Sequence, residues 1–253
     1  MTLNDEHYSK LTSFRIRAMA EHLKGILEQG RDKKMTIEEC VIEMIAAEES
    51  ARADRKIARL NKQAGFSSDG ACVEDIIYLP GRSLDRGYIE RLATGRFIDD
   101  HDHLVIISET GGGKSYLTQA FGNAACRQMK SVRYVRHPDM CKELNIARKS
   151  GSYYDLMESF IAVDLLLLDD FFTTSVSEAN VIDTFEIIEA RVDKGSMVIA
   201  SLIEPDQWHL RIKTETLADS IVDRIVHRSH YIDIKGPNMR EHLSNQRKKR
   251  AKA

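Results

Sequence analysis

Ser108-Glu109-Thr110-Gly111-Gly112-Gly113-Lys114-Ser115 is the stretch that decides the fold. It follows the apolar run His103 to Ile107 and precedes a helix-forming segment, which is the position of a P-loop between a strand and a helix. Three successive glycines let the backbone wrap closely around phosphates with its N–H groups pointing at them. The stretch therefore predicts a nucleotide-binding α/β domain.

The residue types in this loop predict its chemistry. Lys114 is expected to reach the β- and γ-phosphates of ATP, and the Ser115 hydroxyl to ligate Mg²⁺. The usual pattern G-x-x-x-x-G-K-[ST] has a glycine where this chain has Ser108, so the match is one residue short. The plainer alternative is a glycine-rich turn between a strand and a helix. The residues predicted to bind the nucleotide are Thr110, Gly111, Gly112, Gly113, Lys114, Ser115 and Tyr116.

A second motif is Leu165-Leu166-Leu167-Leu168-Asp169-Asp170, an apolar strand that ends in two carboxylates. It resembles a Walker B motif. In that role Asp169 would hold the Mg²⁺ ion, and Asp170 would polarise or orient the attacking water. Two acids that only cap a strand end are the alternative when this motif is taken alone. Because the two motifs occur in the expected order and well separated, together they predict one ATP and magnesium site.

From the loop-rich stretch Cys72 to Arg86 onward, apolar strands alternate with helices, which is typical of βαβ units and a parallel sheet. The predicted helix from Ser177 to Lys194 has Ser177 as N-cap and Gly195 as its stop. Its buried stripe is predicted to be Ile182, Phe185, Ile188 and Val192. The predicted strands are His103 to Ile107, Ser131 to Arg136, Leu165 to Asp169, Met197 to Ser201 and His230 to Ile234.

The residues before this α/β core predict a small all-helical domain. A first helix is expected to end at Gly30, and a second to begin at the capping box of Thr36 and Glu39 and to run to Gln63, about 40 Å. The first contains Leu11, Phe14, Met19, Leu23, Ile26 and Leu27 at helical spacing. The second is expected to carry an apolar stripe of Ile37, Val41, Met44, Ile45 and Ala51 and to end at Ser67 to Gly70.

Composition and charge narrow the classes of protein. The 253 residues are 42% hydrophobic and 30% charged, an ordinary globular composition, and the longest apolar run is too short to span a bilayer. The start of the sequence lacks a basic stretch followed by an apolar one, so we expect a cytoplasmic protein without a membrane partner. No C-x-x-C spacing joins the four cysteines, which we expect to be small buried residues rather than zinc ligands or a disulfide framework: Cys40, Cys72, Cys126 and Cys141.

The net charge of −2 hides two basic clusters. One is on the second helix, where residues three or four apart share one face: Arg52, Arg55, Lys56, Arg59 and Lys62. The other is C-terminal: Arg247, Lys248, Lys249, Arg250 and Lys252. A charged helix face is usually only solvated. If these clusters bind DNA, the absence of aromatic interleaving or zinc-finger spacing predicts largely sequence-independent, salt-sensitive binding to duplex phosphates.

Beyond these motifs, the chain resembles the IstB-like ATP-binding proteins, on the DnaC and DnaA side of the AAA+ ATPases, nearly from end to end. The stretches that carry the resemblance, besides the P-loop, are Ala46-Ala47-Glu48 with Arg52, Leu84-Asp85-Arg86, Gly151-Ser152-Tyr153, Asp164 to Phe171, Phe185 to Arg191, Leu217-Ala218-Asp219 and Asp223 to His227. The resemblance implies a helper ATPase of a DNA insertion sequence, which assembles on target DNA with ATP and directs a cognate transposase to it. It also implies an AAA+ core with a five-stranded parallel sheet. The predicted domains are a helical N-terminal domain that binds DNA or partners (1–66), an ATPase domain (67–240) and a basic C-terminal tail (241–253).

The resemblance also assigns further residues. Arg224 would be the arginine finger, a catalytic residue that reaches the γ-phosphate held by the neighbouring subunit, so hydrolysis would require a homo-oligomer. The alternative for Arg224 is a salt bridge with Asp219 or Asp223. Arg240 is a weaker candidate for a second phosphate-sensing arginine.

Two further departures from the family pattern concern hydrolysis more than binding. Asp170 stands where many AAA+ proteins carry glutamate, and Ser201-Leu202 replaces a serine followed by an amide that helps to position water. Three alternatives therefore stay open beside the transposition helper. They are a DnaC-like loader of a replicative helicase, a nucleotide-dependent DNA clamp without hydrolysis, and a small-molecule kinase, for which no arginine-bearing lid is evident.

Overall fold

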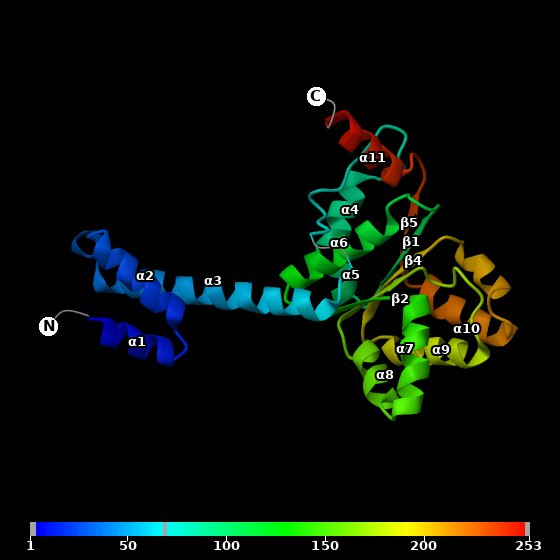
Figure 1. Cartoon of the computed structure of the whole chain (residues 1–253), viewed down its shortest axis with the longest axis horizontal. Helices are drawn as coiled ribbons and strands as arrows, with labels where there is room; N and C mark the ends of the chain where they lie inside the picture. The colour runs from blue at the N-terminus through cyan, green and yellow to red at the C-terminus, as the bar shows by residue number, and fades with distance from the viewer. Residues whose placement is uncertain (1–3, 68–69, 251–253) are drawn as a thin grey trace. The chain divides into compact units, whose positions relative to one another are not determined.

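The structure is a computed structural model that describes residues 4–67 and 70–250. Of the predicted C-terminal basic cluster, the Arg250 side chain and Lys252 lie outside this description, as do Ser68 and Asp69 of the predicted helix end. The chain divides into two compact units, Met1–Arg59 and Leu60–Ala253, both drawn in Figure 1. No helix within the described residues is long and apolar enough to cross a membrane.

The first unit contains α1 (Asp5–Ser13), α2 (Arg17–Glu28), the 3₁₀ helix η1 (Arg31–Lys34) and most of α3 (Ile37–Ala64). The prediction of one helix before Gly30 was wrong, because the helix is interrupted between α1 and α2, where Arg15 has a φ of 63°. Phe14 at this break is 70% exposed. Helical spacing counted across the break therefore joined apolar residues of two separate helices. Gly30, with a φ of 63°, does follow the end of α2 as predicted.

Helix α3 starts as predicted and differs in the face that it buries. The capping box is present, since Thr36 N donates to Glu39 Oε2 at 2.7 Å and Glu39 N donates to Thr36 Oγ1 at 3.1 Å. The predicted apolar stripe is exposed, however, with Ile37 at 85%, Val41 at 44% and Ile45 at 45%. A buried carboxylate takes its place, because Glu48 accepts from the backbone N–H groups of the first turn of α2. A charge at a helix N-terminus is stabilised by the unpaired N–H groups there, which hydropathy does not detect.

The second unit is built on a five-stranded parallel sheet, as predicted. Its strands are β1 (His103–Ser108), β2 (Val132–Arg136), β3 (Leu165–Asp169), β4 (Ser196–Ser201) and β5 (Ser229–Ile234), in the order β2-β3-β4-β1-β5. The register pairs Ile106 of β1 with Ala200 of β4 and with Ile232 of β5. Because all strands run the same way, the carboxyl ends of β1 and β3 lie at the same edge, with β4 between them.

Side chains of the sheet alternate between two cores. Leu104 and Ile106 of β1 face one core, and Val105 and Ile107 face the other. The first core is closed by α4 (Arg86–Ala93), α5 (Arg96–Asp99), α6 (Lys114–Arg127) and the end of α3. The second is closed by α7 (His137–Ser150), α8 (Tyr153–Ile161), α9 (Glu178–Arg191), the 3₁₀ helix η2 (Pro205–Leu210) and α10 (Glu215–Val226). Figure 1 shows α7 to α10 on one side of the strands and α4 to α6 on the other.

Helix α9 has the predicted N-cap, Ser177, but ends at Arg191 rather than Lys194. The backbone turns at Asp193, with a φ of 57°, before it reaches Gly195. Of the predicted stripe, Ile188 is buried and Ile182 is 41% exposed. The buried face includes instead polar and charged residues that hydropathy places outside, namely Asn180, Asp183, Thr184 and Arg191.

Arg191 is fully buried, and its partners within residues 4–67 and 70–250 are backbone carbonyl groups. Its guanidinium donates to the carbonyl oxygens of five residues, at distances from 2.6 to 3.2 Å: Phe160, Ile161, Val163, Asp164 and Ser196. Burial lowers its pKa to about 10. Arg191 thereby joins the end of α8, the start of β3 and the start of β4, and it keeps β3 in place beneath the candidate site.

Candidate nucleotide-binding site

The P-loop lies between β1 and α6, as predicted. Lys114, only 7% exposed, starts α6 and folds back, so that Nζ donates to the carbonyl oxygens of Ser108 at 2.6 Å and Glu109 at 3.2 Å. Burial lowers the pKa of Lys114, while the charges of Asp169 and Asp170 raise it. A buried ammonium group at the N-terminus of a helix gives this end of the site a strongly positive character.

Two positions in the loop require glycine for a reason that the structure makes specific. Gly113 has a φ of 98°, and a Cβ there would lie 2.8 Å from Nη2 of Arg82. A Cβ on Gly112 would overlap the Ser108 hydroxyl, so the residue that departs from the usual pattern fills the space beside Gly112. Ser108 is therefore accommodated because the second of the three glycines, Gly112, has no side chain.

The two carboxylates at the end of β3 have different surroundings. Asp169 is 1% exposed, accepts from Tyr134 Oη at 3.0 Å through Oδ2, and accepts from Asp170 N at 2.9 Å through Oδ1. Burial, more than the nearby acids, raises the pKa of Tyr134 to about 12, so its hydroxyl remains a donor. Asp170 sits at a φ of 52° and its carboxylate pairs with Arg136 at the end of β2. Non-glycine residues rarely adopt this conformation.

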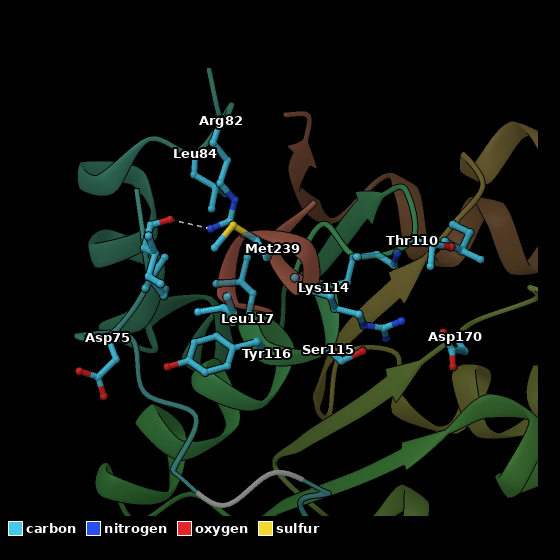
Figure 2. A pocket seen from close by; sticks show the side chains of 17 residues that line it. Asp75, Arg82, Leu84, Thr110, Lys114, Ser115, Tyr116, Leu117, Asp170 and Met239 are labelled. Carbon is cyan, nitrogen blue, oxygen red and sulfur yellow. Dashed lines mark hydrogen bonds between the residues drawn. The ribbon is translucent and has the colours of Figure 1, made fainter. Parts of the chain in front are cut away.

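A cavity of about 420 Å³ opens beside the P-loop (Figure 2). Its polar end is formed by Lys114, Ser115 and Asp170, and its apolar end by residues of three segments far apart in the sequence. The apolar wall consists of Ile76, Ile77, Leu84, Leu117, Met239 and Leu243. Figure 2 shows Leu84, Leu117 and Met239 grouped together, away from Asp170. One charged end and one apolar end suit a ligand with a phosphate chain and a flat organic base.

Helix α11 (Met239–Arg250) closes this cavity and is hydrogen-bonded to the P-loop. Met239 N donates to the Gly111 carbonyl at 2.9 Å, and Asn238 Nδ2 donates to the Thr110 carbonyl at 3.4 Å. The chain reaches this position through Gly236, with a φ of 124°, where a Cβ would lie 2.6 Å from the Gly81 carbonyl oxygen. Only glycine fits that close approach.

Most of the predicted nucleotide-binding residues line the cavity. They are Thr110, Gly111, Gly113, Lys114, Ser115 and Tyr116, together with Asp170. Gly112 and Asp169 are not among the lining residues. The Gly112 carbonyl accepts from Arg82, and the buried Asp169 carboxylate accepts from Tyr134. Leu202, predicted to replace a water-positioning amide, lies in the cavity wall, as does Arg240.

Sequence reasoning missed several residues of the site. Arg82, Ile76 and Ile77 come from the stretch that was predicted only as loop-rich. Met239 lies at the end of the predicted ATPase domain 67–240, and Leu243 lies in the predicted tail 241–253. No local pattern marks them, because they reach the cavity through contacts distant in sequence. The Pro80-Gly81 pair preceding Arg82 is the one available signal, since it indicates a tight turn that would bring neighbouring side chains back onto the domain.

Arg224 lies on α10 and does not line the cavity. Its guanidinium pairs with Glu189, donates to the Ser220 carbonyl at 3.1 Å and lies 5.0 Å from the centre of the Phe185 ring. The sequence suggested Asp219 or Asp223 as the salt-bridge partner of Arg224, and both were wrong, because the partner is Glu189. Asp223 pairs with His227 instead.

The first basic cluster divides into paired and unpaired residues. Arg52 and Arg55 both donate to Glu48 Oε1, at 2.9 and 3.0 Å. Their hydrogen bonds, with that of Arg52 first, lower the pKa of Glu48. Within residues 4–67 and 70–250, no acidic partner is found for the exposed residues Lys56, Arg59 and Lys62. The same holds for Arg247, Lys248 and Lys249 on the last turn of α11.

Comparison with known proteins agrees with this geometry. The sequence profile described as "IstB-like ATP binding protein" matches residues 9–249. The chain is similar to an insertion-sequence ATP-binding protein, y4pL, of Sinorhizobium fredii, with 36% identity over 240 residues that cover 95% of this chain and 96% of the relative. It is also similar to the ATP-binding protein of insertion sequence IS1162 of Pseudomonas fluorescens, with 32% identity over 193 residues, 76% of this chain and 84% of the relative.

Solved structures with the same fold belong to replication proteins. The AMPPCP-bound DnaA of Aquifex aeolicus has a TM-score of 0.58 at 23% identity, covering 71% of this chain and 55% of that one. The DnaC helicase loader has a TM-score of 0.57 at 14% identity, covering 66% of this chain and 98% of that one. The fold of the second unit is thus the P-loop AAA+ core.

Proposed function

The chain belongs to the family of IstB-like ATP-binding proteins, and we propose that it is a Mg²⁺-dependent ATPase that assembles on duplex DNA and directs a transposase to it. One observation carries the catalytic part of this proposal. The buried ammonium of Lys114 and the carboxylate of Asp170 line the same cavity, at the edge of the sheet where β1 and β3 end. That pairing suits phosphoryl transfer, which needs positive charge at the phosphates and a group that orients water.

The donor set of the site also fits a magnesium ion. Mg²⁺ keeps several waters and takes one or two protein oxygens besides those of the phosphates. The Ser115 hydroxyl lines the cavity, and Asp169 lies buried at the end of β3, two strands away from β1, with its carboxylate bound by Tyr134. We propose that these two residues hold the ion, which would neutralise charge on the phosphates.

The roles of the remaining site residues follow from their positions. Lys114 would bind the β- and γ-phosphates, together with the N–H groups of the glycine loop and its flanking residues Thr110 and Tyr116. Asp170 would orient the attacking water. Arg224, which lies outside its own chain's cavity, would act on the nucleotide of a neighbouring subunit after leaving Glu189. Turnover would then depend on a homo-oligomer.

DNA binding and recruitment of a transposase are the finer parts of the proposal. The relatives are named as insertion-sequence proteins, which supports a role in transposition. The basic residues of α3, of which Lys56, Arg59 and Lys62 lack acidic partners in the described chain, would bind phosphates without reading sequence. We further propose that residues 1–66 bind DNA or partners, that 67–240 form the ATPase domain and that 241–253 form a basic tail.

One observation favours a second candidate function. Leu202 in the cavity wall offers no hydrogen bond to a water, so slow or absent hydrolysis would make the protein a nucleotide-dependent clamp on DNA. A loader of the DnaC type shares the fold of the second unit. It would require a helicase partner in place of the transposase.

The test is ATP hydrolysis by the full chain, with and without nonspecific duplex DNA, at low and high salt, for the wild type, Lys114→Ala and Arg224→Ala. We expect DNA to stimulate the wild type, salt to suppress the stimulation and both variants to lose activity. Lys114→Ala should also lose ATP binding, whereas Arg224→Ala should retain it. ATP binding without turnover under every condition would support the clamp and exclude the ATPase.

A further inference from the structure

Arg82 connects the two walls of the nucleotide cavity. Its Nη1 donates to the Ile77 carbonyl at 2.7 Å, and its Nη2 donates to the Gly112 carbonyl at 2.7 Å. Ile77 belongs to the apolar end of the cavity and Gly112 to the P-loop. Figure 2 shows Arg82 beside Leu84 and Met239, with the dashed bond that runs to the apolar wall. Arg82 thus joins its own segment to the P-loop residue Gly112, thirty residues further along the chain.

The surroundings of Arg82 keep it in this position. Burial lowers its pKa, and its Nε is buried without a partner in the described part of the chain. Its backbone is equally confined, because a Cβ on Gly236 would lie 2.9 Å from Arg82 Cα. Removing a guanidinium group from water is unfavourable unless its hydrogen bonds compensate. The two carbonyl bonds are therefore the interactions that stabilise this placement.

The Gly112 peptide is held from two sides. The hydroxyl of Ser108 fills the space that a Cβ on Gly112 would occupy, and the guanidinium of Arg82 binds its carbonyl oxygen. A P-loop binds phosphates through N–H groups that point inward, so its carbonyl groups must point elsewhere. A donor fixed on the Gly112 carbonyl prevents this peptide from turning its oxygen toward the negatively charged phosphates.

We propose that Arg82 is a positioning residue of the nucleotide site, which preorganises the P-loop for the β- and γ-phosphates by fixing the Gly112 peptide against the apolar wall. This inference rests on the ATP binding that belongs to the proposed function. Arg82 acts through the backbone of Gly112 and has no role in the chemical step. Preorganisation lowers the entropy lost on binding and so increases affinity without a new contact to the ligand.

The identity of the side chain matters to this role. The planar guanidinium presents several donors at fixed angles and can bind two carbonyl oxygens at once. A lysine at position 82 would keep the charge but present a single ammonium group on a flexible stem. Arg82→Lys therefore distinguishes the effect of bridging two carbonyl groups from the effect of positive charge alone.

The experiment is calorimetric titration of the full chain with ATP, ADP and AMP in the presence of Mg²⁺, for the wild type, Arg82→Met, Arg82→Lys and Arg86→Met. Arg86 is the matched control, because it lies in the same segment, stacks 4.7 Å from the Tyr78 ring centre and is not one of the residues that line the nucleotide cavity. We expect Arg82→Met and Arg82→Lys to weaken ATP and ADP by about tenfold or more, the effect of one charge-assisted hydrogen bond. AMP lacks the β-phosphate, so its affinity should fall by about twofold at most.

Several outcomes would overturn the inference. Full ATP affinity in Arg82→Lys would mean that the charge at position 82 matters and the bridge between the two carbonyl groups does not. An equal loss of affinity for ATP and AMP would mean that Arg82 stabilises the fold or the binding of the base. If Arg82→Met does not fold, Arg82→Lys decides between these results. Arg86→Met with the same ATP-specific loss would also contradict it. A wild type that binds no ATP would instead exclude the proposed function itself, together with this inference.

Discussion

Arg136 Nη2 lies 2.8 Å from Asp170 Oδ2, and Arg136 Nε donates to the same oxygen at 2.9 Å. The pair joins the carboxyl end of β2 to the residue proposed to orient the attacking water. Arg136 also contacts Asp139, at 3.3 Å. The carboxylate of Asp170 is thus held at the side of the cavity nearest β2.

Arg136→Gln should raise DNA-independent ATP turnover about threefold, which corresponds to a barrier lower by about 0.65 kcal/mol. The physical reason is that Asp170, no longer held by Arg136, can turn toward the γ-phosphate. ATP affinity should be unchanged, because Arg136 does not line the cavity. Steady-state kinetics and calorimetry measure the two effects. The matched control is Arg133→Gln on the same strand, which loses a contact with Glu143 instead. A lower turnover in Arg136→Gln would contradict the prediction and would show that the ion pair with Arg136 holds Asp170 in its working orientation.

Arg191→Leu should lower the free energy of unfolding by about 4 kcal/mol, because buried carbonyl oxygens would lose their donors. Urea denaturation followed by circular dichroism measures this change. Arg191→Lys can donate to fewer of the carbonyl oxygens, so its free energy of unfolding should lie between those of Arg191→Leu and the wild type. The control is Arg228→Leu, because Arg228 forms its ion pairs at the surface. Equal losses of stability in the two leucine variants would contradict the conclusion that Arg191 holds α8, β3 and β4 together.

Stability should fall as the pH is lowered from 6.5 toward 3, because His137 is buried in its neutral form. Burial lowers its pKa from 6.5 to about 3, and its ring packs against the rings of Phe171 and Phe172, with Thr184 Oγ1 at 3.1 Å. In this window the unfolded chain binds a proton that the folded chain does not, so the histidine costs about 2 kcal/mol of stability at pH 5 relative to pH 7.5. Urea midpoints at the two pH values, for the wild type and His137→Gln, measure it. A glutamine variant with the same pH dependence would assign the loss to other groups.

Lys56→Gln combined with Arg59→Gln should weaken duplex binding and reduce the slope of log K against log salt by about 2, since each phosphate contact contributes about 0.9. Fluorescence anisotropy with a labelled duplex over a range of salt measures the slope. Lys10→Gln combined with Lys24→Gln removes the same charge from the same unit, but these lysines pair with Glu6 and Glu28. An equal reduction in this control would mean that net charge, and not the α3 face, determines binding.

The parts that sequence predicted well are those coded by neighbouring residues. The P-loop and the acidic end of β3 are continuous stretches, and each strand is a short apolar run between turn signals, so their order and position could be inferred. The capping box of Thr36 and Glu39 is equally local. What could not be inferred depends on tertiary contacts. Nothing near Arg82 indicates that its guanidinium reaches Gly112.

Hydropathy failed where polar groups are satisfied inside the protein. Glu48 and Arg191 are buried because N–H groups of α2 and five carbonyl oxygens, respectively, compensate for lost water. Conversely, Ile37 and Val41 at helical spacing indicate a buried stripe that the structure leaves exposed. The pattern of apolar residues identified α3 as a helix and misidentified its inner face.

The bond from Met239 N to the Gly111 carbonyl has a consequence for biosynthesis. The ribosome makes all five strands and the whole P-loop before it makes Met239 and Leu243, which complete the apolar wall of the cavity. The sheet can therefore fold during translation, as N-terminal segments generally do first, while the pocket is still open on one side. A nascent chain that has emerged as far as Ile234 carries both motifs but still lacks the part of the apolar wall that Met239 and Leu243 supply.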